Sequence, residues 1–457
     1  MSLGTPVPAE LLSKYGKQGP RYTSYPTAPH FDEAVEYDAL AQAWQESSDD
    51  LSLYVHLPFC AVRCLFCGCH VKITRRTERG MDYVDRVLAE LDLAGRHVDL
   101  SRPLRQLHFG GGTPNFLPPE GLRRLFEGLI ARAGLAPDAE VAIECDPRAL
   151  SHEQVDTLLD LGFNRFSFGV QDLEPEVMAA VNRPTSQHDL EEMVDALRKG
   201  GVRSLNFDLI YGLPKQTQES WERTLATVLD LGPDRLAVYG YAHVPWKARH
   251  QGAIDAADLP DDALRSELAA TARRRLVAGG HVEIGMDHYA LPDDELARAR
   301  RDGSLHRNFM GYTTQRGLDL VAIGTSAISK VGRSYSQDLK DLAAWETAVS
   351  GGRMPWERGL VLSEDDLLRG EIITELSCNG RLDHAEFADR FGCSPPERYP
   401  AEYERLQEMA TDGLLTVDDD AIELTDVGFY LVRNACMVFD TYLATEAEAV
   451  PRYSRTT

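Results

Sequence analysis

Along residues 51–278, short apolar runs alternate with longer stretches in which apolar residues recur every three or four positions. The short runs are typical of buried strands, and the longer stretches of amphipathic helices. Strands are predicted at 51–57, 104–109, 140–145, 163–170, 204–210 and 235–241, with helices at 81–94, after Pro118, and at 151–161, 174–182, 188–200, 221–231 and 261–278. Strands that alternate with helices form parallel sheets with right-handed crossovers. About six such units precede residue 250, fewer than the eight of a closed barrel, so an α/β fold with a three-quarter barrel is predicted.

The segments on either side of this repeat have a different pattern. Residues 1–45 are predicted to form an irregular N-terminal arm, and residues 46–340 the main α/β domain. Residues 341–362 are interpreted as a connector, and residues 363–457 as a mostly helical C-terminal domain. In that domain two short apolar runs flank residues 418–420, which predicts a hairpin and a winged-helix-like fold. Because the hairpin is acidic, structural cover over the active site is favoured over a DNA-binding wing.

Residues 281–337 mix polar, aromatic and small side chains. The three most distinctive runs are 284–290, 306–315 and 321–329. Such a mixture is typical of a binding surface rather than of a core strand. We therefore expect these runs to line a ligand site.

Residues with chemical potential gather where the predicted strands end. A cysteine-rich loop (60–69) follows the first strand, Gly110–Gly112 and Thr113 the second, Glu144 and Asp146 end the third, Gln171 follows the fourth, Asp208 ends the fifth, and Ala242 and His243 follow the sixth. In an α/β barrel these ends form the single rim that carries the chemistry. Taken singly, the glycine run could be a tight turn, and the two carboxylates Glu144 and Asp208 could be helix caps or ion-pair partners. Their shared placement predicts one site.

Composition and charge restrict the partners. The 457 residues have a formal net charge of −24 and 43% hydrophobic residues, enough for a substantial core. The negative charge argues against nucleic acid or an anionic membrane surface as a partner. No apolar run reaches the roughly 20 residues of a bilayer-spanning helix, and the N-terminus lacks the apolar stretch of a signal peptide. With clustered reduced cysteines, these features predict a cytoplasmic protein, with a monomer as the default.

Four of the eight cysteines, Cys60, Cys64, Cys67 and Cys69, lie directly after the first predicted strand. A loop of this length cannot bury four thiols, so they indicate metal chemistry rather than core packing. Their spacings of four, three and two suit a loop that wraps around a compact inorganic core, as in iron–sulfur clusters. Zinc, which more often uses two separated Cys-x-x-Cys pairs, and inert thiols are the alternatives.

The spacing of Cys60, Cys64 and Cys67 resembles the cluster motif of radical S-adenosylmethionine enzymes. Phe66 stands where that motif has an aromatic residue, and the loop follows a first strand as it does there. The resemblance implies a [4Fe-4S] cluster on these three cysteines and the partial barrel of that superfamily. It also implies one iron left open for S-adenosylmethionine, which leaves Cys69 near the cluster but not on it.

Further motifs extend the resemblance over roughly residues 15–455. They are PRYTSYPT, YVHLPFC-x3-C-x2-CGC, LHFGGGTP, IECDP, GVQD, VNR, DLIYGLP, YAHVP, HRNFMGYTT and MVFDTYL. Together they resemble the oxygen-independent coproporphyrinogen III oxidases. The resemblance implies decarboxylation of two propionates of coproporphyrinogen III to vinyl groups, giving protoporphyrinogen IX in haem biosynthesis. It implies a 5′-deoxyadenosyl radical from S-adenosylmethionine as the reactive species, and a low-potential electron donor such as flavodoxin or ferredoxin.

The resemblance also implies roles for single residues. One S-adenosylmethionine is implied near Tyr54, Gly111, Glu144, Ala242 and Ile328, and a second near Phe66, Gly112, Thr113, Gln171, Arg183 and Asp208. The forked guanidinium of Arg183 suits a carboxylate. The substrate propionates need positive partners, for which Arg21 and Arg307 are candidates. His56 on the first strand is either a hydrogen-bonding or proton-handling group or a structural one, and the arm that contains Arg21 is either surface packing or a lid.

Three other functions fit parts of the pattern. A haem-binding trafficking protein on the same barrel is the main rival, although such relatives typically lack both the PRYTSYPT arm and the fourth cysteine. A related radical methyltransferase or cyclopropanase would use the same cluster to give a different product. A winged-helix DNA-binding protein with a zinc site would contain no cluster, which an iron and sulfide assay would detect.

Overall fold

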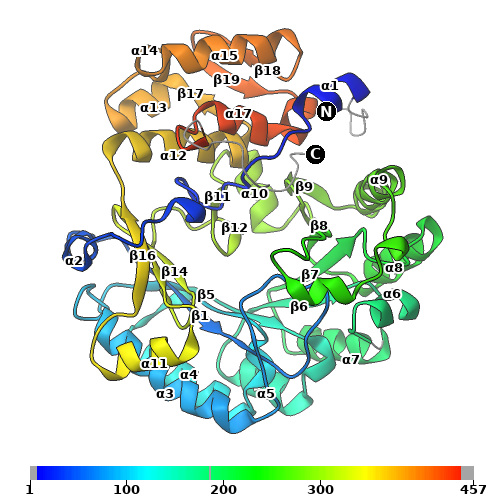
Figure 1. The fold of residues 1–457 in the computed structure, drawn as a ribbon, viewed down its shortest axis with the longest axis vertical. Coiled ribbons are helices and arrows are strands. Elements are labelled where there is room, and N and C mark those ends of the chain that lie inside the picture. The colour runs from blue at the N-terminus through cyan, green and yellow to red at the C-terminus, as the bar shows by residue number, and fades with distance from the viewer. Residues whose placement is uncertain (1–7, 185–186, 444–457) are drawn as a thin grey trace.

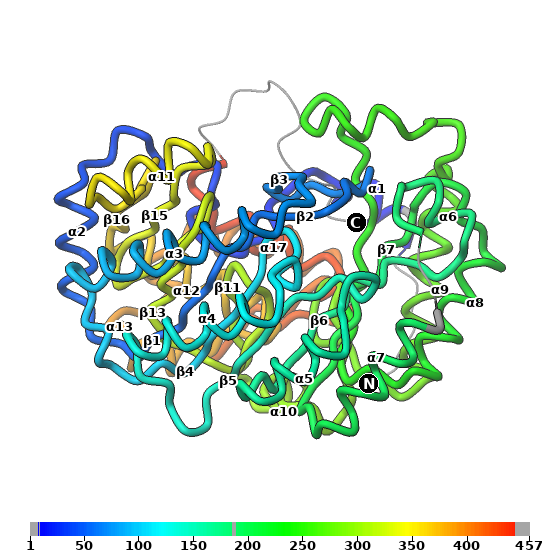
Figure 2. Tube along the Cα trace, turned by 90° about the horizontal axis from the view of Figure 1, so that it is seen from below, coloured from blue at the N-terminus to red at the C-terminus, as the bar shows by residue number. Residues whose placement is uncertain are grey.

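The computed structural model describes residues 8–184 and 187–443. Residues 1–7 of the expected arm and residues 444–457 of the expected C-terminal domain lie outside the described residues. The centre is a twelve-stranded sheet that curves into an open barrel, with helices along its outer face (Figures 1 and 2). No described helix is long and apolar enough to cross a bilayer.

The main sheet has the order β16-β15-β14-β13-β1-β4-β5-β6-β7-β8-β10-β9. Its strands are β1 (Leu51–Leu57), β4 (Leu104–Gly111), β5 (Leu135–Cys145), β6 (Arg165–Gln171), β7 (Ser204–Tyr211), β8 (Arg235–Gly240), β9 (Val282–Gly285), β10 (His288–Ala290), β13 (Asp319–Ile323), β14 (Ile328–Val331), β15 (Ser334–Asp338) and β16 (Trp356–Val361). The small sheets are β2 (Phe59–Cys60) with β3 (Lys72–Ile73), β11 (His306–Asn308) with β12 (Gly311–Thr313), and β17 (Arg381–Asp383) with β19 (Ala421–Leu424) and β18 (Leu415–Val417).

The helices follow the predicted alternation with the strands. They are α1 (Ala9–Tyr15), α2 (Tyr37–Gln45), α3 (Thr77–Ala94), α4 (Pro119–Ile130), α5 (His152–Asp160), α6 (Pro175–Ala180), α7 (Gln187–Lys199), α8 (Gln218–Leu231), α9 (Asp262–Ala278), α10 (Glu295–Arg301), α11 (Leu342–Ser350), α12 (Glu364–Asn379), α13 (His384–Phe391), α14 (Pro395–Arg398), α15 (Pro400–Thr411), α16 (Asp426–Tyr430) and α17 (Val432–Val438). Short 3-10 turns are η1 (Ala28–His30), η2 (Pro114–Phe116), η3 (Pro147–Ala149), η4 (Arg249–Ala253) and η5 (Ala256–Asp258).

The six predicted strands form the parallel part of the sheet, which confirms the partial barrel. Strands β1, β4, β5, β6, β7 and β8 pair in parallel in this order. In β1 six of the seven residues are buried, because helices cover one face and the barrel interior the other. Helix α5 begins with a capping box between Ser151 and Gln154, and α8 with one between Thr217 and Ser220. These local signals set the helix starts close to their predicted positions.

Strand β13 corrects the expectation that residues 321–329 avoid the core. All five residues of β13 are buried, and the strand pairs in parallel with β1, with Ala322 opposite Tyr54. The run joins the apolar end of a core strand to the small and polar turn that follows it. This junction explains why the run looked mixed along the sequence.

Two segments are more ordered than their sequences suggested. Residues 341–362, expected to be a connector, contain α11, which packs against α3, and β16, which pairs with β15 at the edge of the main sheet. The arm, expected to be irregular, contains α1 and α2, and α2 packs against β15 and β16. Both segments therefore extend the packing of the main domain.

The C-terminal domain is helical with a hairpin, as predicted. Strands β18 and β19 flank residues 418–420, and β17 completes the small sheet. The core of this domain includes Tyr22 and Tyr25 of the arm beside Leu406 and Phe439. Helix α12 contacts β9 and β11 of the main domain, and the arm runs between the two domains (Figure 1).

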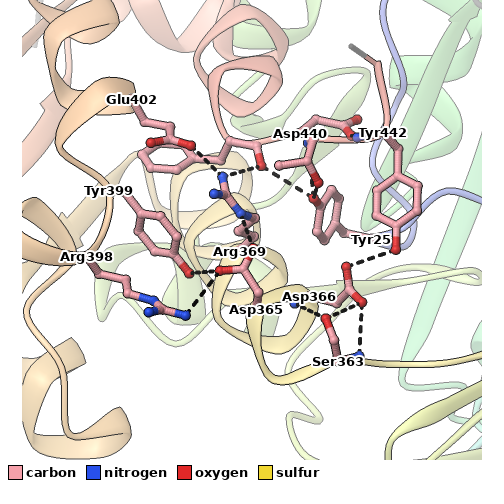
Figure 3. A network of polar contacts seen from close by, with 12 residues as sticks. Tyr25, Ser363, Asp365, Asp366, Arg369, Arg398, Tyr399, Glu402, Asp440 and Tyr442 are labelled. Atoms are coloured by element: carbon pink, nitrogen blue, oxygen red, sulfur yellow. Dashed lines mark hydrogen bonds and ion pairs between the residues drawn. The ribbon is translucent and has the colours of Figure 1, made fainter. Parts of the chain in front are cut away.

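Polar contacts tie the arm to the end of the C-terminal domain. Tyr22 Oη donates to Asp440 Oδ2 at 2.9 Å, and both side chains are buried. Tyr25 Oη lies 3.1 Å from Thr441 Oγ1. Figure 3 shows Tyr25 beside Asp440 in the network that joins these segments.

The segment that contacts the arm is itself held by Arg369. Its guanidinium donates to Asp365 at 2.6 Å, to Glu402 at 2.8 Å and to the carbonyl of Phe439 at 3.2 Å (Figure 3). Because one buried guanidinium joins α12, α15 and the residues after α17, the arm contacts a rigid surface.

Tyr22→Phe is expected to weaken the attachment of the arm. The change leaves a buried Asp440 carboxyl group without its partner, so we expect a loss of about 1–2 kcal/mol in the free energy of unfolding. Denaturant unfolding measures that loss, and tryptic cleavage after Arg21 should become faster. Tyr430→Phe, at a residue that is 48% exposed, is the matched control. Equal cleavage rates in both variants would contradict the role of this hydrogen bond.

Candidate active site

The C-terminal ends of the parallel strands bring the predicted residues together around one cavity. His108, Glu144 and Asp208 line a space of about 180 Å³ inside the barrel, opposite the β11–β12 hairpin. Arg165 lies deeper in the same cavity and pairs with Glu140 at 2.6 Å. The cavity is therefore polar at both ends, with the carboxyl groups nearest the cysteine loop.

The glycine segment after β4 passes close to the strand that leads into the cysteine loop. Gly111 has a φ of +116°, and a Cβ there would lie 2.9 Å from the His56 ring. A Cβ on Gly112 would lie 2.8 Å from the carbonyl oxygen of Phe59. Only glycine fits such an approach, so the segment is more than a tight turn.

The two strand-end carboxyl groups differ in charge. Burial would raise the pKa of Glu144, but hydrogen bonds from His108 Nε2 and the Gly111 N–H, each 3.2 Å long, hold it below its usual value. Burial and the nearby charge of Glu144 raise the pKa of Asp208 to about 7. Near neutral pH the site thus combines an ionised carboxylate that accepts hydrogen bonds with a carboxyl group that can also donate one.

Two of the motif thiols face polar groups from other strands. Cys60 Sγ lies 3.3 Å from Thr113 Oγ1, and burial raises the pKa of Cys60 to about 11. Cys64 Sγ lies 3.3 Å from Arg183 Nη1 and 4.0 Å from Arg148 Nη2. The loop is therefore fixed against the barrel rim through its sulfur atoms.

Cys67 and Cys69 form a coupled pair. The Cys69 N–H donates to Cys67 Sγ at 3.4 Å. Hydrogen bonding from Cys69 lowers the pKa of Cys67 to about 6, and the same contact raises that of Cys69. Cys69 therefore stabilises Cys67 as a thiolate, the form that binds iron. This contact gives the fourth cysteine a physical role beside the triad.

The thiol arrangement fits a polynuclear cluster better than a zinc ion. In the part of the chain that the structure describes, no three Cys, His, Asp or Glu side chains gather closely enough to hold a single metal ion. Structural zinc needs four such ligands around one ion. A cluster instead needs thiolates spread around an inorganic core, as Cys60, Cys64 and Cys67 are along this loop.

Arg183 connects the cysteine loop to the strand ends. Besides Cys64, its guanidinium contacts Asp146 Oδ2 at 3.1 Å and donates to the carbonyl of Gly169 at 2.6 Å. Asp146 also accepts from Arg148 at 2.6 Å. The predicted fork of Arg183 is thus partly occupied by groups of the chain itself.

His56 is neutral and doubly hydrogen-bonded. Burial lowers the pKa of His56 to about 4. Its Nε2 lies 3.2 Å from the His70 carbonyl, which can only accept, so Nε2 bears the proton and Nδ1 accepts from Tyr54 Oη at 3.2 Å. These contacts link β1 to the far side of the cysteine loop, which describes a hydrogen-bonding role.

Residues implied for the second S-adenosylmethionine cluster around the cysteine loop. Phe66 packs beside Val181 and Tyr241, and its carbonyl accepts from Gln251 at 3.1 Å. Gln171 has a φ of +69°, an unusual backbone conformation at the end of β6. Together with Arg183 they surround the loop from the β6 and β8 side.

Residues implied for the first S-adenosylmethionine are more dispersed. The Tyr54 ring stacks on His108 with 5.7 Å between centroids, next to Glu144. Ala242 follows β8, whereas Ile328 begins β14 and packs near Phe31 and Tyr335. The two lie toward opposite ends of the sheet, so the structure brings only the central members into contact.

The two arginines expected to meet propionates lie next to each other. Arg21 forms an ion pair with Asp287, and its carbonyl accepts from Arg307 Nη1 at 2.9 Å. Arg307 is buried and lies over the Tyr312 ring at 5.0 Å. The arm therefore reaches the barrel beside the β11–β12 hairpin, as expected of a lid, and Arg21 is neutralised by a carboxylate of the chain.

A buried carboxyl pair was missed by sequence reasoning. Glu90 Oε2 accepts from the Gly324 N–H at 2.8 Å and from Trp345 Nε1 at 3.1 Å, while Glu90 Oε1 and Asp338 Oδ2 are both buried without a donor. Two such acceptors that interact directly must share a proton. Glu90 lies on the apolar face of α3 with Val87, a signal that was visible in the sequence.

The carboxyl pair supports the backbone of the site. Tyr83 Oη donates to the His56 carbonyl at 2.9 Å and accepts from the Thr325 N–H at 2.9 Å. Gly324, which binds Glu90, precedes Thr325. The turn after β13 is thereby fixed to β1 directly behind His56.

Comparisons with known proteins agree with this geometry. The Radical SAM superfamily model matches residues 54–228, and the HemN C-terminal domain model matches residues 362–431. The chain is 42% identical to oxygen-independent coproporphyrinogen III oxidases from Pseudomonas aeruginosa (95% of this chain, 96% of that one) and from Escherichia coli K12 (97% of each). The solved structure of Escherichia coli coproporphyrinogen III oxidase, a radical SAM enzyme, matches with a TM-score of 0.89 at 41% identity, covering 92% of this chain and 97% of that one.

The carboxyl pair predicts a pH dependence of stability. Burial raises the pKa of Glu90 to about 7 and that of Asp338 well above its usual range. Groups with raised folded pKa values stabilise the fold fully at acidic pH, and this contribution falls as pH rises through about 7. We expect a loss of up to about 3 kcal/mol between about pH 5.5 and about pH 8.5.

Asp338→Asn replaces the shared proton by an amide N–H and should remove most of this loss. Calorimetric unfolding across the pH range compares the variant with the wild type. Asp195→Asn, at an exposed position, is the control. The same pH slope in all three proteins would show that the pair shares no proton.

Proposed function

Because the chain belongs to the family of oxygen-independent coproporphyrinogen III oxidases, we propose that it converts two propionates of coproporphyrinogen III to vinyl groups. The product is protoporphyrinogen IX, an intermediate of haem biosynthesis. The observation that supports this most strongly is the meeting of the cysteine loop with Glu144, Asp208 and Arg183 at one barrel rim. Full-length similarity to the relatives adds the arm and the C-terminal domain to that rim.

The cysteine loop is proposed to hold the cofactor. Cys60, Cys64 and Cys67 would bind a [4Fe-4S] cluster, and Cys69 would stay off it and stabilise the Cys67 thiolate. When bound and reduced, the cluster supplies the electron that cleaves S-adenosylmethionine to methionine and a 5′-deoxyadenosyl radical. Thr113, 3.3 Å from Cys60, and the backbone of the glycine segment shield the loop from the barrel side.

The rim residues are proposed to bind two molecules of S-adenosylmethionine. Tyr54, Gly111, Glu144, Ala242 and Ile328 would serve the first, and Phe66, Gly112, Thr113, Gln171, Arg183 and Asp208 the second. Ionised Glu144 suits hydroxyl donors such as those of a ribose, and Asp208 can accept or donate. Glycines 111 and 112 let a ligand approach the backbone, and Arg183 offers a charged fork.

The arm is proposed to contribute to substrate binding. Arg21 and Arg307 lie side by side between the arm and the hairpin, and the substrate brings four propionates. A propionate could replace Asp287 as the partner of Arg21 without leaving either charge unpaired in a buried site. Neutral His56 would hold β1 and the cysteine loop in register rather than exchange protons.

Partners and compartment follow from the same chemistry. A low-potential electron donor such as flavodoxin or ferredoxin would reduce the cluster. All eight cysteines are unpaired in the structure, which supports the reducing environment of the cytoplasm. We keep a monomer as the working state.

An anaerobic product assay tests the function. Protein with its cluster is incubated with coproporphyrinogen III, S-adenosylmethionine and a strong reductant, and omission of S-adenosylmethionine is the control. We expect protoporphyrinogen IX together with 5′-deoxyadenosine. Tight haem binding without turnover would indicate a trafficking protein, and a methylated product a methyltransferase; either would contradict the proposal.

Serine variants test the ligand assignment. Replacing Cys60, Cys64 or Cys67 should abolish both the brown cluster absorbance and activity, because each removes one of three thiolates. Cys69→Ser is the matched control, since its backbone N–H still reaches Cys67 and the cluster should survive. Cluster absorbance retained in a triad variant, or lost in Cys69→Ser, would overturn the assignment.

A further inference from the structure

The surface around the cysteine loop has the opposite charge to the rest of the protein. The chain as a whole has a net charge of −24. Residues 60–79 contain five basic and one acidic side chains, and residues 243–250 contain two basic and no acidic ones. Such a reversal concentrates positive potential where the chain is otherwise negative.

The two basic segments meet at the cysteine loop. The His250 ring lies 2.7 Å from the Cys67 carbonyl, so residues 243–250 border the loop on one side. On the other side β3 pairs with β2, which places Ile73 opposite Cys60. Lys340 hydrogen-bonds to His70 and extends the positive surface toward α11. Figure 2 shows β2 and β3 at one margin of the molecule rather than inside the barrel.

Large apolar side chains are exposed in the same segments. Trp246 is 61% exposed, Ile73 42% and Val62 38%. They are three of the six large hydrophobic residues that are exposed in the described chain. Aromatic and aliphatic side chains beside basic ones are typical of protein-docking surfaces.

The basic side chains of this surface have no acidic partners within the described residues. Arg75, Arg76, Arg79 and Arg249 are exposed, and none of them forms an ion pair with another described residue. Elsewhere in the chain exposed arginines pair readily, as Arg223 does with Glu174 at 2.8 Å. The positive charge around the loop is therefore left for an external partner.

We propose that this surface, defined by residues 60–79, 243–250 and Lys340, is the docking site of a small acidic protein that delivers single electrons to the cysteine loop. The proposal rests on the proposed function, which needs an electron at the cluster. One electron leaves the low-potential centre of the carrier and enters the cluster, so the carrier is oxidised by one electron and the cluster reduced by one. No bond is made or broken.

A compact acidic protein fits this surface better than other polyanions. Electron-transfer encounters bury less than about 1,200 Å², so a small carrier can contact the basic surface without meeting the acidic remainder. DNA and anionic membranes are extended and would be repelled by the rest of a chain of charge −24. The position over the cysteine loop also keeps the electron path short.

Charge reversal with two reductants tests the proposal. In the cluster-loaded protein, Arg75→Glu and Arg76→Glu are combined; acidic residues at the start of α3 favour the helix, so folding should be preserved. Reduction of the cluster is followed by loss of its absorbance after rapid mixing with reduced flavodoxin or with reduced methyl viologen, a small cation. The control combines Lys199→Glu and Arg203→Glu, exposed residues at the opposite end of the barrel with the same change in charge.

We expect reduction by flavodoxin to slow at least about tenfold at low salt in the Arg75/Arg76 variant and less than about twofold in the control. Reduction by methyl viologen should not slow in either. In the wild type the flavodoxin rate should fall steeply between about 50 and about 500 mM salt. Flavodoxin rates equal in the two variants, or a wild-type rate independent of salt, would overturn the proposal.

A second variant and a binding measurement close the remaining routes. If methyl viologen reduction also slows, Arg249→Glu with Trp246→Ala decides by the same comparison. Tighter binding of the wild type to anionic vesicles or single-stranded DNA than to flavodoxin would also overturn the assignment. These readouts use no porphyrin, so a docking surface that fails leaves the product assay unaffected, and absence of a cluster would instead defeat the proposed function.

Discussion

The site depends on the close pairing of β1 with β4. The two strands stay in register to their ends, with His56 opposite Gly110 and Leu57 opposite Gly111, and the Gly112 N–H donates to the Leu57 carbonyl at 2.8 Å. A side chain on Gly111 would strike the His56 ring, so the pairing can continue only because the segment is glycine. This continuity places the cysteine loop, which begins just beyond β1, against the mouth of the barrel.

The arm converts this local geometry into a property of the whole chain. Tyr22 belongs to the core of the C-terminal domain, yet its neighbour Arg21 pairs with Asp287 of the barrel and accepts from Arg307. A residue anchored in one domain thus presents the next residue to the other. Movement of the C-terminal domain would move Arg21 away from the barrel, so substrate access and domain position are mechanically linked.

Periodicity identified the parallel strands because their cores are uniformly apolar, and β1 was predicted with its observed bounds at 51–57. β13 was missed because its apolar run merges with the turn after it. The pairing of Arg21 with Asp287, separated by 266 positions, depends on tertiary packing that no local pattern encodes. Glu90 was within reach: a carboxyl group on the apolar face of α3 requires a buried partner, although only the fold identifies Asp338.

Charge in this protein has to be considered locally. A chain of net charge −24 contains a pocket in which burial keeps Asp208 close to neutral and a surface in which arginines lack acidic partners among the described residues. The two exceptions flank the cysteine loop, one inside the barrel and one outside. An anionic ligand approaching Glu144 from within avoids a second full carboxylate, and an acidic protein approaching from outside meets Arg75 and Arg249. The acidic remainder of the surface directs negatively charged partners toward these two places by repelling them elsewhere.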